Sequence, residues 1–477
     1  ALKGAVFLFS VFRDSTLREP DFSMSPLHVV ILAAGQGSRM KSTLPKVLHT
    51  LAGRPMLQHV IDTAHELGAD TIHTVIGHGA DQVRQTISDD TIHWVEQRER
   101  LGTGHAVMQV LDHLPDDARV LVLYGDVPLI RKQTLAILVD HVSGDSLGLL
   151  TVTMDDPTGY GRIVRDADGN VTRIVEQKDA SVDQQAIREV NTGILGVSAA
   201  HLKRWLPQLS NDNAQGEYYL TDIIAMAAKD SVEVASNQPA DVMEVQGVNN
   251  RVQLAELERW FQLQQSQQLM LQGATLADPA RIDVRGNLSV GCDVYIDVNA
   301  VFEGEVTLGN RVHVGPGCVI KDAHIGDGTE IKAYSVIESS TIGENAQIGP
   351  YARFRPGNRL AANTKVGNFV ELKKSVVGEG SKISHLSYVG DATLGARVNV
   401  GAGTITCNYD GANKYQTIIG DGVFVGSNCS LVAPVTVAPE ATIGAGSTIT
   451  RDVAESELAV ARGRQRNISG WEKPKKH

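Results

Sequence analysis

A glycine-rich loop with two nearby cations is the first part of this sequence whose residues could do chemistry. Residues 32–40 read LAAGQGSRM, and Lys46 follows six residues after Met40. At the carboxyl end of a strand, the backbone N–H groups of such a loop can approach a phosphate, while Arg39 and Lys46 neutralise its charge. The loop matches neither a Walker A loop nor a complete GxGxxG fingerprint, so a tight strand-to-helix turn is the alternative. The two cations favour a site for a triphosphate.

Asp126 and Asn249 carry the oxygen ligands that Mg²⁺ prefers. Asp126 directly follows the apolar run RVLVLYG at residues 119–125, and Asn249 lies in the segment GVNNR at residues 247–251. Two protein oxygens, together with substrate phosphates and water, are a usual ligand set for magnesium. The alternative for Asp126 is the N-cap of a following helix, because Asp is a favoured N-cap residue.

His385 is the candidate general base in the second half of the chain. The pKa of free histidine lies close to neutral pH, which suits this side chain to taking up a proton. Four polar residues lie on neighbouring repeats of the pattern described below and could reach the same edge: Arg355, Lys373, Tyr388 and Asn399. The alternative is a surface histidine without a role. A zinc site of the carbonic anhydrase kind is disfavoured, because His313, His324 and His385 are too scattered.

Alternating apolar runs and helical stretches predict how the first of these residues are positioned. The runs VVILA (29–33), TIHTVIG (71–77) and RVLVLYG (119–125) are continuous, as in buried parallel strands. We predict a doubly wound, Rossmann-like α/β domain over residues 24–249, with its ligand at the carboxyl edge of the sheet. Residues 250–272 contain neither Gly nor Pro and precede Gly273, which predicts a linker helix about 34 Å long. Residues 1–23 are expected to be a disordered upstream extension before Met24.

Aliphatic residues recur about every six positions beyond residue 280, and a small residue often follows. Examples are Ile325, Ile331, Ile337, Ile342 and Ile348. Three such hexapeptides form one coil of a parallel β-helix, with the aliphatic side chain inside and a small residue at the corner. We predict a left-handed β-helix over residues 273–477, with a basic C-terminal tail from residue 462. Residues 281–477 hold 26 of the 46 glycines. The largest break in the period, residues 407–416, predicts a loop.

Charge and composition disfavour several classes of partner. The 44 Lys and Arg residues against 55 Asp and Glu residues give a net charge of −11, which argues against binding to nucleic acid or to an anionic membrane surface. No apolar run approaches the roughly 18 residues that a membrane-spanning helix needs. The four cysteines, Cys292, Cys318, Cys407 and Cys429, are widely separated, which indicates reduced thiols in a cytoplasm.

Several motifs in a fixed order resemble one family of transferases. Besides the glycine loop with Pro45 and Lys46, they are LGT at residues 101–103, YGD at 124–126, GYGR at 159–162, NTG at 191–193 and SHLSYVGD at 384–391. Residues 27 to about 470 resemble the bacterial bifunctional N-acetylglucosamine-1-phosphate uridyltransferases and glucosamine-1-phosphate acetyltransferases.

This resemblance implies two reactions in the synthesis of UDP-N-acetylglucosamine for the cell wall. The second domain would transfer an acetyl group from acetyl-CoA to glucosamine 1-phosphate. The first domain would then transfer a uridylyl group from UTP to N-acetylglucosamine 1-phosphate and release pyrophosphate. The resemblance also implies Mg²⁺ as the metal, a bacterial cytoplasm, and a homotrimer with acetyltransfer sites between subunits.

The resemblance assigns roles to individual residues. His385 would take the proton of the amine, Arg39 and Lys46 would stabilise the transferred phosphoryl group, and Asp126 and Asn249 would hold Mg²⁺. UTP and UDP-N-acetylglucosamine would contact Leu32, Ala33, Ala34, Gly35, Lys46, Gln97, Gly102, Thr103, Tyr124, Gly125, Asp126, Gly161, Glu176, Asn191 and Asn249. Glucosamine 1-phosphate would contact Arg355, Lys373, Tyr388 and Asn399. Acetyl-CoA would contact Ala402, Asn408, Tyr409, Ser427, Ala445 and Arg462. Turn and cap roles are the alternative for Gly161, Glu176 and Asn191.

Two other functions are compatible with parts of the pattern. The β-helix could serve only to trimerise a sugar-1-phosphate nucleotidyltransferase, although His385, Lys373 and the 407–416 loop argue against this. A sensor of nucleotide sugars without catalysis would not need Lys46, Asp126 and Asn249 together. Residues 463–469, GRQRNIS, depart from the family pattern and leave the acetyl-CoA site undefined beyond Arg462.

Overall fold

A computed structural model of the chain describes residues 25–143 and 146–473. The expected disordered extension, residues 1–23, lies outside the described residues. The chain divides into two compact units, of which the first comprises residues up to Leu48 and Met56–Gly247, and the second His49–Pro55 and Val248–His477. Of the described helices, none is long and apolar enough to cross a membrane.

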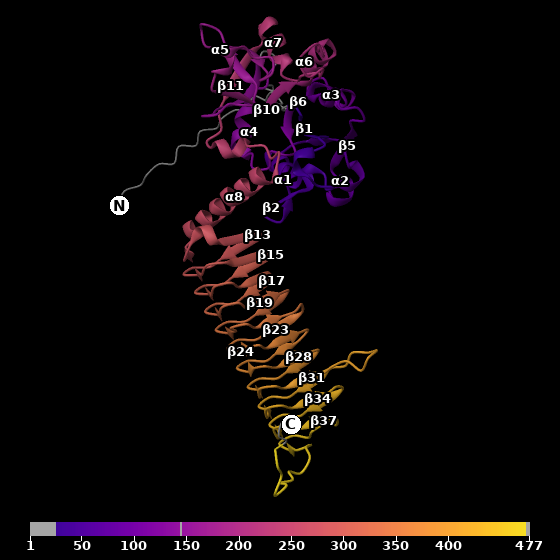
Figure 1. Cartoon of the computed structure of the whole chain (residues 1–477), viewed down its shortest axis with the longest axis vertical. Helices are drawn as coiled ribbons and strands as arrows, with labels where there is room; N and C mark the ends of the chain where they lie inside the picture. The colour runs from indigo at the N-terminus through magenta and orange to yellow at the C-terminus, as the bar shows by residue number, and fades with distance from the viewer. Residues whose placement is uncertain (1–24, 144–145, 474–477) are drawn as a thin grey trace, which may run out of the picture. The chain divides into compact units, whose positions relative to one another are not determined.

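The first unit is built on one mixed sheet flanked by helices (Figure 1). Seven strands run in the order β11-β7-β10-β6-β1-β4-β5. Off this path, β8 pairs with the interior strand β10, and β9 pairs with β8. Their bounds are β1 Leu27–Ala33, β4 Thr71–Ile76, β5 Ile92–Glu96, β6 Arg119–Tyr124, β7 Ser146–Thr153, β8 Arg162–Arg165, β9 Val171–Val175, β10 Glu189–Ser198 and β11 Glu233–Asn237. The helices are α1 Met56–Leu67, α2 Ala80–Thr86, α3 Thr103–Met108, α4 Lys132–Asp140, α5 Val182–Gln185, α6 Ala199–Trp205 and α7 Asp222–Lys229.

The predicted doubly wound fold is confirmed for this unit. β1 pairs in parallel with β4 on one side and with β6 on the other. Its side chains alternate between two buried apolar clusters, Val29 and Ile31 in one and Val30 in the other, as expected for a sheet covered on both faces. The sheet is not wholly parallel, because β10 runs antiparallel to both β6 and β7. The order reverses at β1, so the loops after β1 and β6 leave side by side at the carboxyl edge.

The second unit begins with one long helix, α8 (Arg251–Leu271), whose N-cap Asn250 accepts hydrogen bonds from two backbone N–H groups. The helix is bound to the first coil of the β-helix. The buried amide of Gln262 donates to Val284 O at 2.9 Å and accepts from Val284 N at 2.7 Å. A hairpin, β2 (Thr50–Leu51) and β3 (Arg54–Pro55), joins the same unit, since Ala52 N donates to Glu258 Oε2 at 2.6 Å.

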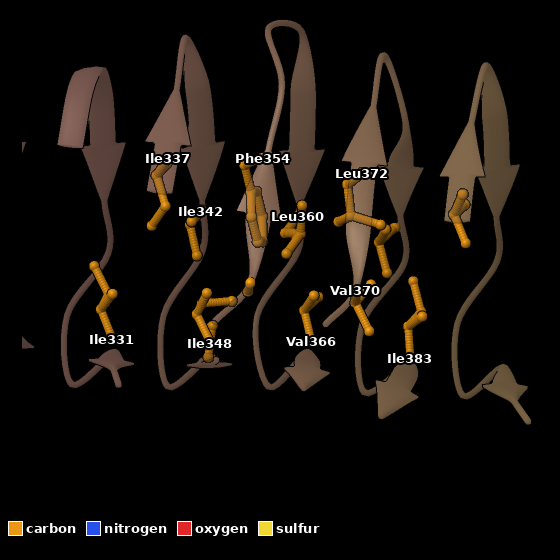
Figure 2. Close-up of a cluster of buried hydrophobic side chains, with 14 of the residues drawn as sticks. Ile331, Ile337, Ile342, Ile348, Phe354, Leu360, Val366, Val370, Leu372 and Ile383 are labelled. Carbon is orange, nitrogen blue, oxygen red and sulfur yellow. The ribbon is translucent and has the colours of Figure 1, made fainter. Parts of the chain in front are cut away.

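The rest of the second unit is a parallel coil of short strands, from β12 (Thr275–Leu276) to β38 (Leu458–Ala459). Strands of successive coils pair in parallel with equivalent aliphatic residues in register: Ile331 with Ile348, Ile348 with Val366, and Val366 with Ile383. One coil therefore takes 17 or 18 residues. Figure 2 shows these side chains pointing into the coil interior, where they are almost fully buried. This arrangement agrees with the predicted left-handed β-helix.

The predicted loop at residues 407–416 interrupts this register. Val400 pairs with Val425, so this coil takes 25 residues instead of 17 or 18. The loop lies between β31 (Ile405–Cys407) and β32 (Thr417–Ile419), and an isolated bridge between Tyr409 and Lys414 closes it. In Figure 1 it extends away from the stacked coils beside β31.

We expected small residues at the corners of the β-helix coils, and the structure confirms this only in part. Tyr334, Tyr351 and Phe369 occupy equivalent corners with φ between 55° and 57°, so bulky residues adopt the left-handed backbone there. Glycine is needed for a different reason at Gly326 and Gly343. A Cβ at either residue would lie 2.7 Å from backbone atoms of the next coil. Close stacking of the coils therefore accounts for part of the glycine content.

Candidate active sites

The first unit contains a cavity of about 530 Å³ at the carboxyl ends of β1 and β6. Ten of the fifteen residues predicted to contact nucleotide line it: Leu32, Ala33, Ala34, Gly35, Lys46, Gln97, Gly102, Thr103, Tyr124 and Asp126. Four lining residues were not predicted: Val47, Arg100, Ala106 and Glu217. The cavity lies at the point where the strand order reverses, which is the usual ligand site of this fold.

The two glycines of the loop after β1 have different surroundings. A Cβ at Gly35 would meet no atom within 4 Å, so this side of the loop faces open space. Gly37 has φ +64°, and a Cβ there would lie 2.5 Å from Lys46 Cβ. Gly37 thus allows Lys46 to pack close to the loop, while Gly35 leaves the backbone accessible to a ligand.

Lys46 and Asp126 form an ion pair inside the cavity. The Lys46 side chain is 14% exposed and the Asp126 side chain 19%, so water screens the pair only in part. Asp126 is not a helix N-cap, because α4 begins at Lys132 after Arg131. The alternative considered for Asp126 is therefore wrong, and its carboxylate is directed to a cation.

The opposite end of the cavity is formed by Gln97 and the start of α3. Gln97 is 4% exposed, and its amide nitrogen donates to Gly102 O at 3.2 Å. Gly102 has φ +108°, and a Cβ there would lie 2.6 Å from Tyr218 O. Thr103 Oγ1 accepts a hydrogen bond from Leu220 N at 3.2 Å. The segment around Tyr218 thus holds this wall in place.

Three predicted sugar contacts lie together outside the lining of this cavity. Asn191 N donates to Gly161 O at 2.8 Å, and a Cβ at Gly161 would lie 3.2 Å from Glu176 Oε1. Burial raises the pKa of Glu176, and nearby carboxylates including Asp222 add to the rise, although a hydrogen bond from Thr221 opposes it. Asn191 also makes a local turn contact, since its Oδ1 accepts from Gly193 N at 3.0 Å.

Three further predicted residues are placed elsewhere. Arg39 lies in the short 3₁₀ helix Ser38–Met40 and is exposed. Gly125 is packed, since a Cβ there would lie 3.2 to 3.3 Å from Leu57, Ala33 and Val47 side chains. Asn249 belongs to the second unit, where its N–H donates to Gln253 Oε1 at 2.8 Å.

In the β-helix, Lys373, Tyr388 and Asn408 meet around Asp391. Lys373 Nζ lies 3.7 Å from Asp391 Oδ2, and the Asn408 amide donates to the same carboxylate and to Tyr388 Oη, the latter at 3.4 Å. The nearby Lys373 ammonium lowers the pKa of Lys414 in the 407–416 loop. The structure therefore brings two lysines and a carboxylate to one place on the coil.

His385, at the end of β27 (Lys382–His385), is oriented by a residue that was not predicted. Its Nδ1 lies 2.7 Å from Oδ1 of Asn368, which occupies the same position on the preceding coil. An amide oxygen only accepts hydrogen bonds, so the proton of a neutral His385 lies on Nδ1 and Nε2 keeps its lone pair. The side chain is exposed, and Nε2 is the nitrogen that can act as a base.

The other predicted acetyltransferase residues are less closely associated. Arg355 Nη1 donates to Glu371 Oε1 at 3.3 Å, and Glu371 pairs with Tyr388 on the next coil. Asn399 pairs with Lys382, three positions before His385. Predicted acetyl-CoA contacts follow one another on successive coils. Gly446, which follows Ala445, donates its N–H to Ser427 O at 2.8 Å, and Arg462 Nη1 donates to Ala445 O at 2.7 Å. Ala402 begins this column, and Tyr409 lies exposed in the loop.

Comparisons with known proteins cover both units. Residues 29–169 match a family model described as a MobA-like NTP transferase domain, residues 284–358 match a GMPPB C-terminal domain, and residues 416–451 match the bacterial transferase hexapeptide. "Bifunctional protein GlmU" of Marinobacter nauticus is 72% identical over 95% of this chain and 100% of its own length. The proteins of the same name from Stutzerimonas stutzeri and Saccharophagus degradans are 60% and 61% identical, each over 94% of this chain and 99% and 100% of their own.

The chain belongs to the GlmU family. This confirms the predicted family, and the two domain matches confirm a bifunctional transferase that carries out uridylyl transfer and acetyl transfer in UDP-N-acetylglucosamine synthesis. As a member of this family, the chain takes small-molecule substrates, a nucleotide and acetyl-CoA among them. Among the described residues there is no group of three or more His, Cys, Asp and Glu side chains arranged to hold a metal ion.

Proposed function

We propose that the cavity of the first unit binds UTP and the phosphate group of N-acetylglucosamine 1-phosphate, and that Lys46 and Asp126 are its chemical centre. The observation that carries this assignment is a half-buried ion pair beside a glycine loop whose Gly35 faces open space. An oxygen of the sugar phosphate attacks the α-phosphorus of UTP, and the bond to the β-phosphate oxygen breaks to release pyrophosphate. The nucleophile is already an anion, so the reaction needs charge neutralisation and alignment instead of a general base. Lys46 and Arg39 supply positive charge.

We propose Asp126 and Asn249 as the protein ligands of Mg²⁺. A carboxylate and an amide oxygen are the donor types that magnesium prefers, and the present partner of Asp126 is a cation, as expected for a carboxylate placed to bind one. The metal would neutralise charge on the nucleotide and sugar phosphates. With Asp126 holding a metal, Lys46 would be available to phosphate. Gly161, Glu176 and Asn191 form the sugar site.

For acetyl transfer we propose that His385 Nε2 takes the proton from the amine of glucosamine 1-phosphate as nitrogen attacks the thioester carbon. The carbon–sulfur bond then breaks, and the protonated His385 gives this proton to the departing sulfur, so that coenzyme A leaves as the thiol. Lys373 and Arg355 bind the sugar phosphate, and Tyr388 and Asn399 orient the amine. Acetyl-CoA lies along the column that begins at Ala402, and its other proposed contacts are Asn408, Tyr409, Ser427, Ala445 and Arg462.

We further propose that the second unit assembles as a homotrimer. Tyr334, Tyr351 and Phe369 stack on one another along one corner, with ring centroids 5.3 and 5.4 Å apart, and are 49 to 56% exposed. Leu386, next to His385, extends this apolar edge and is 62% exposed. A second copy would cover it. We assign uridylyl transfer to residues 24–249 and acetyl transfer to residues 273–477. We also propose that the enzyme acts in the cytoplasm, where both co-substrates are made.

A paired assay tests these assignments. Glucosamine 1-phosphate and acetyl-CoA are supplied and thiol release is followed, and UTP with Mg²⁺ is then added and pyrophosphate is followed. We expect both signals, and His385→Ala should abolish the first and leave the second. Pyrophosphate formed from the preacetylated sugar phosphate, without any thiol release in the first step, would mean that the β-helix only trimerises the enzyme. Equal loss of both signals in His385→Ala would assign His385 a structural role.

A further inference from the structure

The amide of Gln97 is held in one orientation by groups behind the cavity wall. Its nitrogen lies 3.2 Å from Gly102 O and 3.1 Å from Nδ1 of His105 in α3. The carbonyl of Gly102 can only accept, so the nitrogen end of the amide must face it. His105 Nδ1 then accepts as well, and the proton of His105 lies on Nε2.

This arrangement leaves the amide oxygen of Gln97 for a ligand. In the described part of the chain no hydrogen bond reaches Gln97 Oε1, and it is not among the buried polar atoms without a partner. Because Gln97 lines the cavity, this oxygen reaches the open space there. The wall therefore presents a hydrogen-bond acceptor.

We propose that His105 is a positioning residue that sets the choice of pyrimidine by keeping Gln97 in this orientation. The inference rests on the proposed binding of UTP in the cavity. Uracil has an N–H donor at ring position 3, which an acceptor can bind, whereas cytosine has a lone pair there, which an acceptor repels. Turning the Gln97 amide over would suit cytosine. It would also place Oε1 against Gly102 O and against the lone pair of His105 Nδ1.

A second glutamine competes for His105 from its other side. Gln109 Nε2 lies 3.3 Å from His105 Nε2 and 3.1 Å from His105 O, one helical turn away. One neutral imidazole cannot accept from both amides. Gln97 is buried, so a lost hydrogen bond there is costly, whereas Gln109 is only half-buried and can turn to water. The contact with Gln97 therefore decides the tautomer.

The test compares kcat/KM for UTP and CTP with N-acetylglucosamine 1-phosphate and Mg²⁺, measured as pyrophosphate release by the full chain. His105→Leu keeps the size of the side chain and removes the acceptor, and we expect the UTP:CTP ratio to fall about tenfold, equivalent to about 1.4 kcal/mol. His105→Asn places an amide oxygen where Nδ1 was and should restore the ratio to within about threefold of wild type. Gln109→Ala removes the other side-chain hydrogen bond of His105 and should leave the ratio unchanged.

Three outcomes would overturn the role of His105: an unchanged ratio in His105→Leu, an Asn variant as unselective as the Leu variant, or a ratio that falls equally in Gln109→Ala. Absence of pyrophosphate from UTP with the wild-type protein would instead reject the function proposed for the cavity. A measurement on the wild-type protein covers the case in which His105→Leu does not fold. With ¹⁵N-histidine labelling and assignment through His105→Asn, a proton found on Nδ1 of His105 would also overturn the proposal.

Discussion

Replacing Asn368 by Ala should reduce acetyl transfer without touching any substrate contact. The substitution removes the acceptor that lies 2.7 Å from His385 Nδ1 and fixes the proton there. A neutral hydrogen bond contributes about 0.5 to 1.5 kcal/mol, and the imidazole also regains freedom to rotate and to change tautomer. We therefore expect kcat/KM for acetyl transfer to fall about tenfold, which corresponds to about 1.4 kcal/mol.

The assay follows thiol release from acetyl-CoA and, in the same preparation, pyrophosphate release from UTP. The matched control is Asn363→Ala, which removes an exposed contact with Glu379 Oε1 at 3.4 Å on a neighbouring corner of the coil. It should leave both rates unchanged. Asn368→Ala should lower only thiol release. A thiol-release rate within twofold of wild type, or an equal loss of both activities, would refute the orienting role of Asn368.

Asn368→Asp gives an independent check through the dependence of acetyl transfer on pH. A carboxylate beside Nδ1 stabilises the imidazolium, and the protonated ring cannot take a proton from the amine. The acidic limb of the rate profile should therefore move to higher pH by about one unit. A limb that stays at the wild-type position would show that residue 368 does not act through His385.

Three other perturbations have defined outcomes. Lys46→Met removes the cation of the half-buried pair and should lower uridylyl transfer at least about a hundredfold, with thiol release unchanged as the control. Gln262→Ala leaves the N–H and C=O of Val284 unpaired in a buried place, so thermal unfolding should show a loss of about 2 to 4 kcal/mol. Burial beside other imidazoles, among them His28, lowers the pKa of His73 to about 3. Between this pKa and the ordinary histidine pKa of about 6.5, the unfolded chain binds one proton more than the folded chain. The free energy of unfolding should therefore be highest above about pH 6.5 and should decrease as the pH falls toward 3. Urea titrations at several pH values should show a weaker pH dependence for His73→Leu than for wild type.

Much of the first site could be predicted because strand ends and short motifs determine it. Continuous apolar runs predict the strands β1, β4 and β6, which the structure contains. Because β1 and β6 are parallel neighbours, the residues that follow them lie together at the carboxyl edge of the sheet. Arg100 and Glu217 were missed because they come from irregular loops, where no periodicity relates sequence to position. Arg100 belongs to the same loop as Gln97 and donates to Gln36 Oε1 at 3.1 Å, a contact that only the folded loop reveals.

In the β-helix the period was predictable and the exact register was not. A uniform repeat of 18 would place the residue preceding His385 on the neighbouring coil at position 367, which is a glycine. The coil in fact takes 17 residues here and puts Asn368 beside His385. A change of one residue in the length of a coil cannot be recognised from the aliphatic pattern, because the corners between strands vary in length. This change nevertheless determines which polar side chain lies beside His385.

The two reactions differ in what they require of the chain, and the two sites differ accordingly. Phosphoryl transfer from an anionic nucleophile needs aligned charges. On the proposed assignment, the first unit supplies the cavity, the cation and the carboxylate from its own residues. Acetyl transfer needs a base and a long groove for a large thioester. His385 and the column from Ala402 to Ala445 lie on an open face, beside an apolar edge and a projecting loop. A single coil offers a face and no second wall. On the proposed assignment, a second copy of the chain packed against the apolar edge would supply the other wall of the acetyl-CoA site.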